Sequence, residues 1–330
     1  MKFTIKAIPQ TYGDFFILEF TGISGDEHAI VLDMGTRGVY MEYGRKELRK
    51  YKSIDLCVLS HIHDDHIGGT LKFIDDVYGG ILVPEIKQWW FNARRVLAPM
   101  QESRASEPIS VIQANRIAGY LSNHSDEMEW RNDIKRGDRF DFDGLMIYVL
   151  SPGEVKWLDI MPCMEEEHIV ESIGGKRNDY NSKVREFDMS AYAEDQNEYN
   201  RSSIALLLEY EGKQFLWMAD AVPSEVVQSL RELGYGEEDP VQCEYMTLSH
   251  HGSKGNTSME LLSLVSCNKF IVTGNGMNTY NLPDKETLAR VIHQFGGDVQ
   301  FYATSLSWQL EKVFEVDGEY KIEEKITFAM

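Results

Sequence analysis

The sequence predicts a mixed α/β (α+β) fold. Two observations lead to this class. The chain opens with short runs of strand length that are rich in β-branched and aromatic residues, and such runs later alternate with segments of helical periodicity. The same succession occurs twice along the chain, which predicts two β-rich halves flanked by helices.

In the first half, glycine-containing turns separate the expected strands. Strands are expected at 3–8, 14–20 and 28–35, and a charged helix at 41–50. The run "IDLCVLS" (54–60) is apolar throughout, which is typical of a strand buried on both faces. A helix is expected after Ile67 and a strand at 80–84, because apolar residues recur first at helical and then at strand spacing.

Two segments in the middle of the chain break the alternation. Residues 85–135 are interpreted as a helical insertion, within which Trp89 and Trp90 either pack in a core or stack on a nucleotide. A strand is expected at 144–152. Residues 154–200 are polar, acidic and poorly periodic, so they are interpreted as a long surface excursion, either a lid over a substrate or a loop without function.

The second half repeats the early pattern. A hairpin is expected around Glu211 and Gly212, followed by a strand that leads to Asp220. The remaining elements are helices, closed or capped by glycine, serine or asparagine, and strands between them. Helices are expected at 222–234, 256–266 and 283–296, and strands at 242–249, 269–276 and within 298–330.

Composition favours a soluble, cytoplasmic protein with no membrane partner. The four cysteines are scattered without CxxC spacing, as expected for reduced thiols, and the N-terminus lacks an apolar stretch of signal-peptide length. The chain has 53 acidic and 33 basic residues, a net charge of −20. Such a surface repels long phosphate backbones, so a nucleic-acid substrate is expected to be a short strand or a small phosphodiester.

The densest chemical signal is "HIHDDH" (61–66), at the carboxyl end of the buried strand 54–60. Imidazole and carboxylate are ligands for zinc, manganese or iron. On a loop that leaves a strand, residues two apart can converge on one ion, and the adjacent Asp65 and His66 can turn towards a second. We therefore predict a divalent-metal site with one or two ions, zinc or manganese, and expect Asp64 to point outward.

This motif resembles the HxHxDH signature of the metallo-β-lactamase superfamily. Further segments resemble the hydrolase domain of the ComEC-type competence proteins: "LSHIHDDHIGG", "VLSP", "SSIALLLEYEGKQFLWMADA", "LSHHGSKGNTS" and "IVTGNGMNTYNLPDKETLARVI". The resemblance covers most of residues 1–310. It implies one domain over residues 1–330, built as a four-layer αββα metallo-β-lactamase sandwich with a helical insertion and with its site at the edge of the two sheets.

The resemblance also implies roles for single residues. His61 and His63 would hold one metal ion, Asp65 and His66 the other, and Asp220 would bridge both. By its residue type alone, Asp220 could also cap the following helix. One histidine of "LSHHGS" completes the second site; we favour His250 as that ligand and His251 as an acid or base. Asp65 is expected to orient the reactive water.

Two segments depart from the resembled pattern. The resemblance implies a third histidine for the first ion, but "VLSPGE" (149–154) contains none, and Leu282 stands at the other place where that histidine is expected. The first ion is therefore expected to be weakly held, to keep extra waters or to be absent. Ser253 and Asn256, which follow the histidine pair, have either substrate-binding or loop and capping roles.

Three functions follow from this constellation. The first is a metal-dependent phosphodiesterase or nuclease, acting through hydroxide formed from water at the metal. The second is a carbon-centred hydrolase, such as a lactonase, thioesterase or β-lactamase. The third is a non-enzymatic module with a partly decayed site. The retained ligand types favour a hydrolase, and the ComEC-like segments favour the phosphodiesterase.

Overall fold

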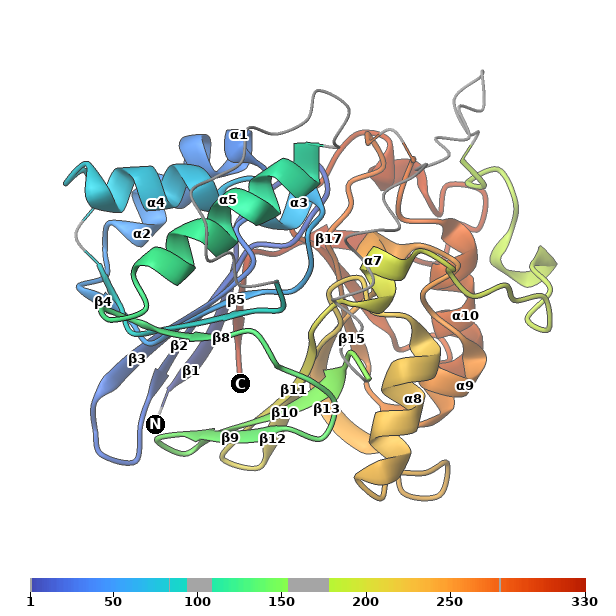
Figure 1. The fold of residues 1–330 in the computed structure, drawn as a ribbon. Coiled ribbons are helices and arrows are strands. Elements are labelled where there is room, and N and C mark those ends of the chain that lie inside the picture. The colour runs from blue at the N-terminus through green and yellow to red at the C-terminus, as the bar shows by residue number, and fades with distance from the viewer. Residues whose placement is uncertain (1, 83, 94–108, 154–177, 279) are drawn as a thin grey trace.

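The strands form two large sheets in the computed structural model, which describes residues 2–82, 84–93, 109–153, 178–278 and 280–330 (Figure 1). The first sheet has seven strands, in the spatial order β18 (Thr327–Ala329), β1 (Phe3–Ala7), β2 (Phe16–Thr21), β3 (Glu27–Leu32), β5 (Leu56–Leu59), β7 (Gln88–Phe91) and β8 (Glu129–Arg131). Pairing is antiparallel from β18 to β3 and parallel from β3 to β8.

The second sheet comes mainly from the later half of the chain. Its main path is β17 (Ile322–Glu324), β16 (Gln300–Ala303), β15 (Lys269–Val272), β13 (Val241–Thr247), β12 (Lys213–Trp217), β11 (Ala205–Tyr210), β10 (Leu145–Ser151) and β9 (Arg139–Phe142). Short β14 (Val265–Ser266) pairs with β13, while β4 (Ser53–Ile54) and β6 (Glu85–Ile86) form a separate pair. The predicted hairpin between β11 and β12 is confirmed, with Glu211 and Gly212 at positive φ in its turn.

The two sheets pack face to face around an apolar core. Side chains alternate across each strand, so neighbouring residues on β2 face opposite layers: Leu18 lies in the core between the sheets and Ile17 lies under the outer helices. The core between the sheets also contains Trp217 of β12 and Trp90 of β7. Both indole rings are fully buried, and burial of such large apolar surfaces is a major source of stability.

Helices cover the outer face of each sheet. Those on the first sheet are α1 (Arg37–Val39), the π-helical turn η1 (Tyr40–Gly44), α2 (Arg45–Leu48), α3 (Asp64–Ile67), α4 (Thr70–Tyr78) and α5 (Ile109–Asn123). Those on the second sheet are α8 (Pro223–Glu232), α9 (Met259–Ser263) and α10 (Lys285–Phe295). Shorter turns are η2 (Val184–Glu186), α7 (Glu198–Arg201), η3 (His250–Gly252) and η4 (Leu310–Lys312). This confirms the four-layer αββα sandwich. Among the described residues, no helix has the length and apolar character needed to cross a membrane.

Two expectations about the middle of the chain are wrong. The strand expected at 80–84 is absent among the described residues of that range, and the next strand, β6, begins at Glu85. Residues 85–91 were expected to be helical, yet they form β6 and β7, and β7 pairs between β5 and β8 inside the first sheet. Trp89 and Trp90 are fully buried on opposite faces of β7, so they are core residues and do not offer a stacking surface. The helical part of the expected insertion is confirmed for α5, and residues 94–108 and 154–177 lie outside the described residues.

Candidate metal centre

The predicted ligands follow the carboxyl ends of three strands. His61 and His63 follow β5 of the first sheet, Asp220 follows β12, and the histidine pair follows β13, the parallel neighbour of β12. The backbone N–H of Ile204 donates to the carbonyl of Ser60 (3.0 Å), which ties the end of β5 to the start of β11 in the second sheet. The site therefore lies where the two sheets meet.

Several residues around this edge have a strained backbone. Asp33, Ala219, His250 and His251 have φ of 56°, 44°, 49° and 57°. Left-handed conformations cost non-glycine residues free energy, and they persist where surrounding contacts fix them, often at functional sites. The strain at His250 and His251 turns adjacent side chains in different directions, so the two imidazoles do not serve the same place.

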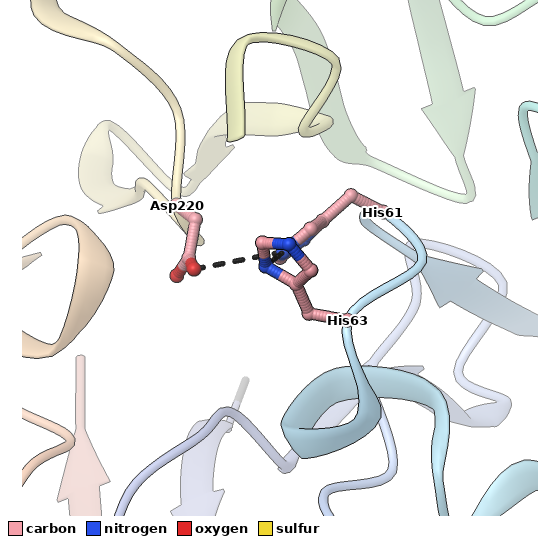
Figure 2. A group of neighbouring side chains, drawn as sticks. All are labelled: His61, His63 and Asp220. Atoms are coloured by element: carbon pink, nitrogen blue, oxygen red, sulfur yellow. Dashed lines mark hydrogen bonds and ion pairs between the residues drawn. The ribbon is translucent and has the colours of Figure 1, made fainter. Parts of the chain in front are cut away.

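The first group of ligand atoms consists of His61, His63 and Asp220, whose candidate atoms all lie within 4.8 Å of one another. His61 Nε2 and His63 Nδ1 are 2.9 Å apart, and His61 Nε2 is 3.5 Å from Asp220 Oδ2. Figure 2 shows the Asp220 carboxylate facing the two imidazole rings across the space between the elements that carry them. His250 Nε2 lies 3.7 Å from the same carboxylate oxygen, which adds a third imidazole on this side.

The second group consists of Asp65, His66 and His251, again with candidate atoms within 4.8 Å of one another. His251 Nε2 is 2.9 Å from Asp65 Oδ2, and His66 Nε2 is 3.7 Å from that oxygen. The sequence favoured His250 as the histidine that joins Asp65 and His66. The structure places His251 there instead, because of the turn that the strained backbone makes between the two residues.

Asp220 connects the two groups. Its Oδ2 faces His61 and His250, whereas its Oδ1 lies 3.2 Å from His66 Nε2 and 3.8 Å from His251 Nε2. Both oxygens and His66 Nε2 are buried, and among the described residues their only partners are ion-pair contacts, which lack hydrogen-bond geometry. Unsatisfied buried polar atoms are rare and costly. Their convergence from two sides of one carboxylate fits a pair of divalent cations that share this carboxylate.

The pKa shifts in the cluster agree with a site for divalent cations. Burial lowers the pKa of His61 and His63, which keeps these imidazoles neutral, as metal ligation requires. Burial also disfavours charge on His66, but Asp220 and Asp65 outweigh it and raise the pKa of His66 well above its usual value. In return, His66 helps to hold the pKa of the Asp220 carboxyl well below its usual range against burial. The carboxylates therefore stay ionised and demand positive charge beside them.

In His61, His66 and His251, the Nδ1 atom faces away from the cluster and has a partner. His66 Nδ1 is 2.7 Å from Asp33 Oδ2, and Ser60 Oγ links His61 Nδ1 (3.0 Å) to the same oxygen (2.7 Å). His251 Nδ1 contacts Thr273 Oγ1 at 2.9 Å. With Nδ1 protonated and the ring neutral, as metal ligation requires, Nε2 of these three histidines presents a lone pair to the cluster. Asp33, Ser60 and Thr273 were not predicted as site residues; the signal for Asp33 was a carboxylate that ends an apolar strand.

The structure also shows where the other residues singled out in the sequence lie. Asp64 is exposed, as expected, and accepts a hydrogen bond from Gln113 (2.7 Å). Leu282 is buried in the loop before α10. Asn256 holds the loop around the histidine pair, because its Nδ2 donates to the backbone oxygen of Asp220 (3.2 Å). For His250, Asp220 and Asp195 outweigh burial and raise the pKa to about 9.

Gly13 offers a test of how tightly Asp65 is held. A Cβ at Gly13 (φ +111°) would lie 2.2 Å from the backbone oxygen of Asp65, whereas a Cβ at Gly25 (φ +89°) would meet no atom within 4 Å. Both alanine substitutions should cost ~1–2 kcal/mol for the positive φ. Gly13→Ala should cost a further ~1–3 kcal/mol from overpacking and weaken metal binding, because Asp65 must move. Urea unfolding and zinc titration check this, and equal effects of the two variants would contradict it.

Comparisons with known proteins give weak similarities. No family model and no curated protein sequence matches the chain. The solved structures that resemble it include YhfI, a metallo-β-lactamase fold protein from Bacillus subtilis (TM-score 0.46, 8% identity, 100% of both chains covered). Others are a diphosphatase of the PhnP family (0.44, 10%, 100% of this chain and 98% of that chain) and Zn²⁺-bound PqqB from Methylobacterium extorquens (0.47, 10%, 100% of both). With TM-scores below 0.5, these similarities do not establish function, so the assignment depends on the side-chain geometry.

Proposed function

We propose that the chain is a metal-dependent hydrolase that cleaves a phosphodiester. The observation that supports it is the division of the two unsatisfied, buried Asp220 oxygens between two groups of imidazoles. The first ion would be held by His61, His63, His250 and Asp220, and the second by Asp65, His66, His251 and Asp220. A donor set of imidazole and carboxylate fits zinc, with manganese as the alternative.

The protein residues would prepare this site for hydrolysis. When bound, divalent cations lower the pKa of water towards neutrality and offset charge on substrate oxygens. Asp220 and Asp65 place two negative charges beside the imidazoles, which draws cations to this edge of the sheets. Asp33 fixes the orientation of His66 and, through Ser60, that of His61, so that little reorganisation is needed at the moment of reaction.

Phosphodiesters are favoured because paired cation sites suit in-line displacement at phosphorus, where the attacking and leaving oxygens both need compensation. Aromatic rings also flank the cluster. The Tyr12 ring lies 6.2 Å from the ring of His251, and a tyrosine on α7, Tyr199, lies 5.6 Å from His63. Such rings suit a substrate with a flat apolar group beside the phosphate, such as a nucleobase.

The adjacent residues Asp64 and Asp65 provide a matched pair of variants to test the proposed hydrolysis. Wild-type protein with zinc or manganese should hydrolyse bis(p-nitrophenyl) phosphate faster than lactone or β-lactam reporters. Asp65→Ala should lower the phosphodiester rate by ~10³-fold, since loss of one cation removes several kcal/mol of transition-state stabilisation. Asp64→Ala should stay within about twofold, as surface substitutions usually have small effects.

The substrate panel also separates the alternatives. Preference for the lactone or the β-lactam would replace the phosphodiesterase by a carbon-centred hydrolase. Metal binding without turnover of any reporter would favour a non-enzymatic module. Equal loss of activity in Asp64→Ala and Asp65→Ala would contradict the roles assigned to the two side chains.

A further inference from the structure

Asp195, in the polar excursion at 154–200, places its carboxylate beside the metal centre. Asp195 is fixed by its own backbone, whose N–H donates to the carbonyl of Gly255 (3.0 Å) in the loop after the histidine pair. Its Oδ1 accepts from the backbone N–H of Asn197 (2.9 Å), and the Asn197 side chain caps α7. Asp195 is therefore held between a helix start and the His250 loop.

The other oxygen of Asp195 faces His250. Asp195 Oδ2 accepts hydrogen bonds from Asn200 Nδ2 (2.6 Å) and Asn256 Nδ2 (3.2 Å) and lies 3.3 Å from His250 Nδ1. Asn256 Oδ1 is 3.2 Å from the same imidazole nitrogen. Two acceptors thus converge on His250 Nδ1. Asn200 Nδ2 also lies 3.2 Å from this nitrogen, but its 2.6 Å bond to Asp195 identifies the carboxylate as its main acceptor.

When the His250 ring is neutral, as metal ligation requires, this arrangement decides which of its nitrogens carries the remaining proton. A carboxylate and an amide oxygen at Nδ1 favour the Nδ1–H tautomer, which leaves a lone pair on Nε2. Nε2 faces Asp220 Oδ2 at 3.7 Å. The His250 side chain is 26% exposed, whereas His61 and His66 are fully buried. Packing therefore constrains His250 less than His61 and His66, and its orientation depends more on the partners of Nδ1.

We propose that Asp195 is a positioning residue that makes His250 the third imidazole of the first metal site. The inference builds on the proposed function, which assigns a metal ion to His61, His63, His250 and Asp220. It gives the excursion around residue 195 a role in metal binding, and it explains how the first site is completed although Leu282 carries no ligand atom. A carboxylate behind a ligating histidine raises the basicity of the ligand and fixes its ring.

The test is zinc affinity measured by calorimetry and by competition with a chromophoric chelator. Asp195→Asn removes the charge and keeps the shape, and it should weaken one of two zinc sites by about 10- to 100-fold while the other stays within about threefold. Asp188→Asn is the matched control: it makes the same change in the same segment, where the described contacts of Asp188 are local, to Ser190 and Ala191. This control should bind zinc like the wild type.

A double variant separates positioning from a general structural role. In a His250→Ala background, Asp195→Asn should change zinc affinity by less than about twofold, because its effect acts through the absent imidazole. An equal loss in that background, or wild-type affinity in Asp195→Asn alone, would overturn the inference while the proposed function stands. Wild-type protein that binds neither zinc nor manganese would overturn the proposed function, and this inference with it.

Discussion

Asp220→Ala is expected to abolish binding of both metal ions and to lower phosphodiester hydrolysis by at least ~10³-fold, about 4 kcal/mol of transition-state stabilisation. The reason is geometric, since Asp220 supplies one oxygen to each group of imidazoles. Substitutions at His61 or Asp65 touch one group each and should leave one ion bound. Metal analysis of the three variants after dialysis, with circular dichroism to verify folding, checks this pattern.

The control for Asp220 is an aspartate outside the cluster. Asp239 is exposed in the turn before β13, so Asp239→Ala should retain metal and activity within about twofold. Loss of only one ion in Asp220→Ala would show that the carboxylate serves a single site. Retention of both ions would contradict the bridging role altogether.

Arg290→Met is expected to give the largest loss of stability, ~3–5 kcal/mol. Arg290 on α10 is almost fully buried and donates to the backbone oxygens of Lys254 (2.6 Å), Thr257 (3.0 Å) and Ala191 (3.0 Å). The buried Thr257 oxygen, left without a donor, costs ~1–3 kcal/mol, and loss of the two part-buried bonds to Lys254 and Ala191 adds to this. The change in the free energy of unfolding in urea measures this directly.

The same arginine links the excursion to the histidine loop. Ala191 precedes Asp195, and the other two carbonyls flank the loop that carries Asn256. Arg290→Met should therefore also weaken zinc binding at the first site. Arg231→Met is the matched control, because Arg231 pairs with Glu260 and both side chains are 54% exposed; an exposed pair is worth ~0–1 kcal/mol. Equal destabilisation by the two variants would contradict the role of burial.

Most strands were predictable because burial on one or both faces leaves a direct pattern in the sequence. Residues 85–91 show the limit of that pattern. Adjacent Trp89 and Trp90 have neither a clear alternation nor a clear helical period, and a short apolar run fits either element. Parallel partners on both sides, β5 and β8, select the strand, and these contacts are distant in sequence.

The site was predictable where ligands are close in sequence. "HIHDDH" concentrates four candidate ligand residues in six positions, and Asp220 and the histidine pair end strands that were recognised. The different directions of His250 and His251 could not be predicted, because they depend on two consecutive left-handed residues. Asp195 carried no signal, since its role depends on the folding of a polar segment against Gly255 and Asn256.

The most direct test of the account is the zinc content of the wild-type protein, measured by elemental analysis after saturation and dialysis beside Asp220→Ala. The account predicts about two ions per wild-type chain, as in two-metal hydrolases, and close to none in Asp220→Ala. A wild-type chain that retains neither zinc nor manganese, or an Asp220→Ala chain that retains as much metal as the wild type, would contradict it.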